Sequence, residues 1–222
     1  MGLTLHDHLT IIGLLIQTGL PVTLQLMAGS FLGACVIGLV GGILRSFKIP
    51  VVDQILGLYA QLCRGIPDMV VLLFLFAIMA VGTSYSISVL AISLIQGAYM
   101  QEIIKGGILS IDKGQWEAAK AMSLPVPITL FRIIIPQVML IALPALIGQV
   151  VLLIKGTSVA STIGCMELTK RGVLAMAQYS NALVIYGYIL VIFFIMCHTL
   201  TMIGKKLEKA VVRKIMGDNY EQ

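Results

Sequence analysis

The apolar tracts of this chain decide its fold, and the clearest of them reads IIIPQVMLIALPALIGQVVLLI over residues 133–154. A helix needs about 20 apolar residues to cross a bilayer, and this tract reaches that length without a single charged side chain. Three further tracts carry no charged residue, and they cover 8–44, 69–101 and 172–204. The pattern predicts an all-α protein whose helices lie in a membrane.

The composition supports the same interpretation. The chain has 222 residues, of which 59% are hydrophobic and 11% are charged, whereas soluble domains carry about 25% charged residues. So few charges cannot cover a water-facing surface, so the apolar side chains must face lipid or one another. The net charge of +5 does not indicate a nucleic-acid partner, because the basic residues are scattered between the apolar tracts.

The number of spans is four or five, depending on how residues 50–104 are divided. Five spans, at about 20–43, 54–80, 87–108, 133–154 and 182–204, place 11 of the 15 basic residues on one side. These are Arg45, Lys48, Lys105, Lys113, Lys120, Arg132, Lys205, Lys206, Lys209, Arg213 and Lys214. The opposite side has Lys155, Lys170 and Arg171, and Arg64 lies within a span. Four spans would divide the basic residues 9 to 6.

Basic residues concentrate on the cytoplasmic side of membrane proteins, so the five-span division is favoured. It predicts one transmembrane domain over residues 1–222, with the N-terminus outside and the C-terminus in the cytoplasm. Glycine pairs such as Gly29/Gly33 and Gly38/Gly42 in the first span would let neighbouring helices approach closely.

The cytoplasmic loop over 109–132 is longer than a helix bundle needs, because helix connections usually take about 2–8 residues. Residues 115–122 are good helix formers, with Asp112 as a start signal and Pro125 as a stop signal. So short a helix is not stable alone in water, and its alanines beside Trp116 and Glu117 would suit the groove of a partner. A connector helix lying at the membrane surface would also explain this segment by itself.

The same loop resembles that of the permease subunits of ABC importers. Their signature is Glu-Ala-Ala, then Gly four residues after the second Ala, then Ile-x-Leu-Pro. Here Glu117-Ala118-Ala119 is followed by Ser123 at the glycine position and by Ile133-Ile134-Ile135-Pro136. The resemblance implies a type I ABC importer permease fold. The residues that it assigns to coupling with an ATPase are Gly114, Glu117, Ala118, Ala119, Ser123 and Pro136.

Other segments resemble one branch of that family, the polar amino acid permeases, and the resemblance covers about residues 18–204. Arg64-Gly65-Ile66-Pro67 is similar to the Arg-Gly-Thr-Pro of that branch, and Ala98–Ile103 is similar to its Ala-Tyr-x-x-Glu segment. Lys155-Gly156-Thr157-Ser158 is similar to Lys-Asp-Thr-Ser, with Gly156 in place of the aspartate. The branch implies transport of polar amino acids.

A charge at bilayer depth costs about 2.5–3.5 kcal/mol on insertion scales, so the few charged residues inside the predicted spans need an explanation. Arg64 and Asp68 are four residues apart and would pair if one helix continued through both. Alternatively, Arg64 orders a break at Gly65-Ile66-Pro67, where freed carbonyls line a cavity. Glu102 and Lys105 could form a similar structural pair.

A transported amino acid carries a carboxylate and an ammonium group, and each needs a partner. Lys155, Thr157 and Ser158 are suited to the carboxylate, and Glu167 is the acidic residue available for the amine, although Lys155 could also simply extend to the interface. The candidate pathway residues are Arg64, Glu102, Lys155, Thr157, Ser158 and Glu167.

The chain lacks a Gly-x-x-x-x-Gly-Lys-Ser/Thr phosphate loop, so it does not hydrolyse ATP by that route. The resemblance implies two cytoplasmic ATPase subunits, an external solute-binding protein and a second permease chain, identical or related, in a bacterial inner membrane. We expect no cofactor, metal site or catalytic residue. An ion-coupled secondary transporter is the alternative, but it would need acidic or histidine residues at mid-span, and this chain has few.

The topology can be tested with reporter fusions at five positions. Fusions after Ser46, Ser84, Lys120, Lys170 and Gly217 should report inside, outside, inside, outside and inside, because the basic residues hold their flanks in the cytoplasm. An external signal at Lys120 would contradict both the topology and the placement of loop 109–132 on the ATPase side.

Overall fold

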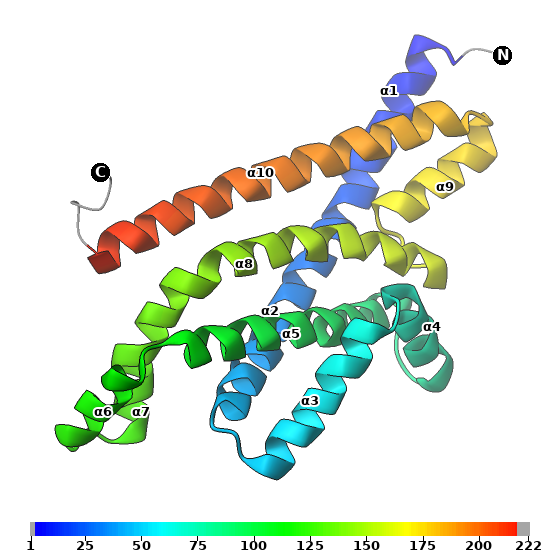
Figure 1. Cartoon of the computed structure of the whole chain (residues 1–222). Coiled ribbons are helices and arrows are strands. Elements are labelled where there is room, and N and C mark those ends of the chain that lie inside the picture. Colours follow the sequence, from blue (N-terminus) through cyan, green and yellow to red (C-terminus); the bar gives the residue numbers. More distant parts are fainter. Residues whose placement is uncertain (1–2, 217–222) are drawn as a thin grey trace.

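The structure, a computed structural model, describes residues 3–216, which are almost entirely helical and contain no strand. The first helical run consists of α1 (Leu5–Leu14), the π-helical turn η1 (Leu15–Gly19) and α2 (Leu20–Ser46). The elements that follow are α3 (Pro50–Gly65), α4 (Asp68–Ile78), α5 (Ser84–Ser110), α6 (Lys113–Ala121), α7 (Val126–Ile128), the π-helix η2 (Thr129–Ile134), α8 (Ile135–Gly156), the 3-10 helix η3 (Thr157–Ile163), α9 (Leu168–Tyr179) and α10 (Ala182–Met216). Figure 1 shows α6, α7 and the α2–α3 turn at one end of the bundle, and α1 and α9 at the other.

Among the described residues, four helical runs are long and apolar enough to cross a membrane, and the bent pair α3–α4 makes five if it is counted as one broken span. The four runs are Leu5–Ser46, Ser84–Ser110, Val126–Ile163 and Ala182–Ile215. The prediction of an all-α membrane protein is therefore confirmed. The first run contains 42 residues, about twice what the hydrocarbon core requires, and extends well before the predicted start near residue 20.

The first helix begins early because its N-terminus is capped. The Thr4 hydroxyl accepts a hydrogen bond from the Asp7 N–H at 3.3 Å, and the Asp7 carboxylate accepts one from the Thr4 N–H at 2.8 Å. This reciprocal capping box satisfies donors that a helix start leaves unpaired. The helix can therefore continue past the predicted span into the polar terminus.

The segment predicted as the second span, 54–80, is broken at Pro67, which confirms the alternative of a break at Gly65-Ile66-Pro67. Ile66, the residue before the proline, is extended with φ −104° and ψ 137°, as the proline ring requires. The axes of α3 and α4 consequently differ in direction by 111°. The break separates Arg64 and Asp68 onto different helices, so the predicted pairing of these two residues along one helix is wrong.

Close contact between α2 and α5 is made possible by glycine, which confirms the prediction for Gly38 and Gly42. A Cβ atom added to Gly38 would lie 2.5 Å from the Met100 Cβ, and one added to Gly42 would lie 2.7 Å from the Ile104 Cβ. On the facing helix, a Cβ at Gly97 would lie 2.7 Å from the Ile37 Cγ2. Small residues let backbones approach in lipid, where water does not drive helices together.

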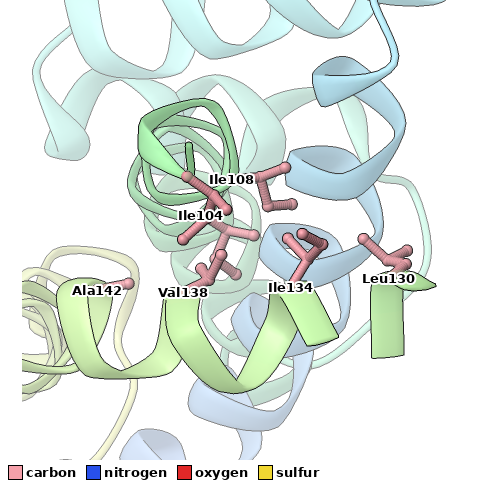
Figure 2. Packing of buried hydrophobic residues seen from close by; sticks show 7 residues of the cluster. Ile104, Ile108, Leu130, Ile134, Val138 and Ala142 are labelled. Carbon is pink, nitrogen blue, oxygen red and sulfur yellow. The ribbon is translucent and has the colours of Figure 1, made fainter. Parts of the chain in front are cut away.

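A buried cluster attaches loop 109–132 to the bundle. Figure 2 shows α5, η2 and α8 converging through the side chains Ile104, Ile108, Leu130, Ile134, Val138 and Ala142. Ile111 belongs to the same cluster, and Trp116 of α6 packs against it. The loop is therefore a packed part of the fold, and it holds α6 in a defined place.

The α2–α5 contact predicts that Gly38→Ala lowers the thermal midpoint of the detergent-purified protein, because the added methyl group overpacks the contact by about 1–3 kcal/mol. Gly148→Ala is the matched control, since a Cβ there meets nothing within 4 Å and alanine is the better helix former. Equal midpoints for the two variants would contradict the importance of this contact.

Candidate functional site

The helix α6 is closed at both ends by local hydrogen bonds. At its start, Asp112 Oδ1 accepts from the Gly114 N–H at 2.6 Å. A Cβ at Gly114 would lie 2.8 Å from the same oxygen, so glycine suits this cap. At its end, the Ser123 N–H donates to the Lys120 carbonyl at 2.9 Å and the Leu124 N–H donates to the Ala119 carbonyl at 3.0 Å. These two bonds form a Schellman motif, the usual glycine-containing end of a helix.

Ser123 occupies the position of this motif that requires a left-handed backbone, and its φ is +55°. Glycine reaches that conformation without a steric cost, whereas a residue with a Cβ does not. This explains physically why a glycine stands at the corresponding place of the permease signature. The serine keeps the same turn at a higher conformational energy.

The two faces of α6 have different surroundings. Trp116 packs against the buried cluster and Ala119 is only 1% exposed, so these side chains attach α6 to its own chain. Glu117 and Ala118 are exposed, as is Gly114, while Pro136 lies partly buried in the first turn of α8. Of the Glu-Ala-Ala residues, the first two are thus available to a partner and the third is occupied by the fold.

A charged network joins α2, α3 and α5 near the same end of the bundle. The buried Arg45 donates from Nε to Asp53 Oδ1 at 2.8 Å and from Nη1 to the Glu102 carboxylate. Lys105 Nζ lies 2.9 Å from the same Asp53 oxygen. The predicted pair Glu102–Lys105 is therefore wrong, because Asp53 reaches Lys105 from α3. A buried charge is tolerated only when it is paired in this way.

Arg64 attaches the end of α3 to this network more loosely. Its Nη1 lies 3.9 Å from Glu102 Oε2, and its guanidinium carbon lies 5.5 Å from the centroid of the Tyr99 ring. An arginine over an aromatic face gains a cation–π attraction. The two predicted pathway residues Arg64 and Glu102 are thus brought together beside the α3–α4 break.

The predicted carboxylate-binding segment lies at the end of α8. Lys155 is exposed and lines a groove of about 560 Å³ with α10, including Phe194 and His198. The hydroxyls of Thr157 and Ser158 donate to the carbonyls of Ile154 and Lys155, at 2.7 and 2.9 Å. Lys155 is therefore accessible, whereas both hydroxyl protons are already used within the helix.

Glu167 lies elsewhere, as the N-cap of α9. Its side chain is 0% exposed and accepts from the N–H groups of Thr169 and Lys170, at 2.9 and 2.8 Å. Burial raises the pKa of Glu167 to about 7, although these backbone hydrogen bonds act in the opposite direction. Lys155 therefore lies against α10, whereas Glu167 lies at the start of α9. Both carboxylate oxygens of Glu167 already accept hydrogen bonds.

Sequence reasoning missed two buried glutamines that face each other between α5 and α8. Gln149 Nε2 donates to Gln96 Oε1, and both residues are buried. A Cβ at Gly156 would meet only Gln96 Nε2, at 3.9 Å. Their signal in the sequence is an amide side chain within each of two charge-free tracts. The space at Gly156 is bordered by a neutral amide.

Comparison with known proteins identifies membrane components of binding-protein-dependent transporters as similar to this chain. The family described as "Binding-protein-dependent transport system inner membrane component" matches residues 34–213. The L-cystine transport system permease protein TcyB of Bacillus subtilis is 31% identical over 206 residues, covering 90% of this chain and 88% of that protein. The glutamine transport system permease protein GlnP of Escherichia coli is 31% identical over 204 residues, covering 89% and 93%.

Solved structures share the fold. An amino acid ABC transporter crystallised with histidines superposes with a TM-score of 0.83 at 26% identity, covering 95% of this chain and 100% of that chain. The inward-facing MetNI methionine ABC transporter gives a TM-score of 0.76 at 21% identity, over 89% and 96%, and this likeness concerns the fold alone.

The left-handed backbone of Ser123 predicts that Ser123→Gly raises the thermal midpoint, because the substitution removes a conformational cost of about 1 kcal/mol. Ser110→Gly is the control, since Ser110 lies at a helical position where glycine is unfavourable. A lower midpoint for Ser123→Gly would show that the turn does not need the left-handed conformation.

Proposed function

This chain belongs to the family of binding-protein-dependent transport system inner membrane components, and from that premise we propose that it carries polar amino acids as the permease of an ABC importer. It is a multi-pass inner membrane protein with the type I importer permease fold, and it is a transport subunit whose ATP hydrolysis lies in separate subunits. The observation that carries the proposal is α6, which exposes Glu117 and Ala118 while Trp116 and Ala119 hold it on the bundle.

The proposed assembly contains two cytoplasmic ATPase subunits, an extracytoplasmic solute-binding protein and a second permease chain, identical or related. The family description itself refers to a binding protein. A second chain is needed because four or five spans make a thin conduit by themselves. The N-terminus lies outside and the C-terminus in the cytoplasm, which brings α6 and the α2–α3 turn to the ATPase side.

The proposed pathway residues are still Arg64, Glu102, Lys155, Thr157, Ser158 and Glu167, but they have different roles from one another. Arg64 and Glu102 meet at the α3–α4 break, and Lys155 offers an accessible cation for a carboxylate. Glu167 acts by fixing the start of α9, because its oxygens are already hydrogen-bonded.

The neutral space at Gly156 favours amino acids without a strongly cationic side chain. The relatives named above include transporters of glutamine and cystine. An ion-coupled secondary transporter gains no support from any of these observations.

The proposal predicts that Glu117→Lys lowers the amount of ATPase retained by the purified complex about tenfold, since a reversed charge meets the partner's complementary surface. ATP-driven uptake of labelled glutamine, cystine, histidine and arginine into proteoliposomes should fall with it. Glu208→Lys makes the same charge change on α10 as a control. Full retention and full uptake by Glu117→Lys would refute docking through α6.

A further inference from the structure

A second surface adjoins the exposed face of α6 and shares Glu117 with it. It is a groove of about 570 Å³ between α6 and the α2–α3 turn. The residues that matter for its chemistry are Phe47, Lys48, Leu109, Lys113, Trp116 and Glu117. The groove therefore combines an aromatic and aliphatic floor with two lysines at its sides.

Lys48 stands where the backbone favours glycine. Its φ is +53°, and its N–H donates to the Arg45 carbonyl at 3.1 Å as the first residue beyond the C-cap of α2. A left-handed residue with a side chain is less favourable than glycine. The retained conformational cost makes the Lys48 side chain a candidate for a functional contact.

The groove is also exposed in a way that suits a protein partner. Phe47 is 41% and Leu109 is 47% exposed, and neither Lys48 nor Lys113 forms an ion pair among residues 3–216. An apolar floor with unpaired lysines is complementary to a peptide segment that presents a carboxylate beside an apolar side chain.

We propose that this groove is a second part of the ATPase-docking surface, so that the ATPase grips α6 and the α2–α3 turn together. A segment of the ATPase enters between them, with an acidic side chain near Lys48 and Lys113 and an apolar one against Phe47 and Trp116. This inference rests on the proposed function and adds a contact on a different element. Because Lys48 lies three residues after Arg45, the contact adjoins the charged network of α2, α3 and α5.

Lys48→Gly separates the role of the side chain from that of the fold. The substitution relieves the left-handed strain, so the thermal midpoint should stay level or rise, while the ATPase retained per chain should fall about three- to tenfold. Lys48→Glu should lose more, and Lys48→Arg should retain the wild-type amount. Lys209→Ala is the matched control, because it removes an exposed lysine from α10, outside the groove.

Crosslinking identifies the occupant directly. A photoreactive side chain placed at position 48 or 109 of the full chain should crosslink to the polypeptide that carries the Gly-x-x-x-x-Gly-Lys-Ser/Thr phosphate loop. The same group at position 183, at the other end of the bundle, should not. Crosslinks to lipid alone would overturn the proposal.

The outcomes of the two proposals differ. If Lys48→Gly and Lys48→Glu keep all the ATPase while Glu117→Lys loses it, the groove is refuted and the proposed function stands. If Glu117→Lys also keeps all of it, docking on this end of the chain is refuted altogether.

Discussion

The close contact between α2 and α5 is the constraint on which the rest of the structure depends. In lipid, apolar side chains gain nothing by leaving one neighbour for another, so helices associate through close packing and a few polar contacts. The glycines of α2 and Gly97 of α5 bring the two backbones together along much of their length. That approach places Arg45 beside Glu102 and positions the end of α5 to receive η2 and α8. The charged network and the buried cluster on which α6 packs both depend on this one helix pair.

Polar side chains in this protein lie where an ion pair or a hydrogen bond is available to them. Charges gather near the ends of α2, α3 and α5, where five ionised side chains neutralise one another in part. Deeper in the bundle the polar side chains are neutral, as with Gln96 and Gln149. An uncharged interior costs less to maintain when a transported molecule has left, because no isolated ion remains in a poorly hydrated place. Lys155 lies in the last turn of α8 and is exposed, which supports the proposal that it contacts a carboxylate.

Local signals predicted the helices well, and long-range contacts account for what they missed. The charge-free tracts identified the membrane helices, and Asp112 and Pro125 marked the limits within which α6 lies. Pairing Arg64 with Asp68 failed because Pro67 lay between them, a signal that was present in the sequence. Pairing Glu102 with Lys105 failed because Asp53 comes from another helix, which no local spacing reveals. Glu167 was interpreted as a free acid because glutamate is not among the common N-cap residues. The left-handed Lys48 had no signal, since nothing in its neighbourhood distinguishes it from an ordinary basic flank.

The cluster around Ile134 has a mechanical consequence. Packed interiors resist compression and do not deform gradually, and this cluster contains residues of α5, η2 and α8 with Trp116 of α6 against it. A force applied to the exposed face of α6 therefore cannot be absorbed locally by sliding that short helix over a soft surface. It is transmitted to the ends of α5 and α8 as a single rigid block. The helix α8 runs on from this cluster to Gly156, so its first turns move with α6, and Pro144 inside it is the place where the helix can bend.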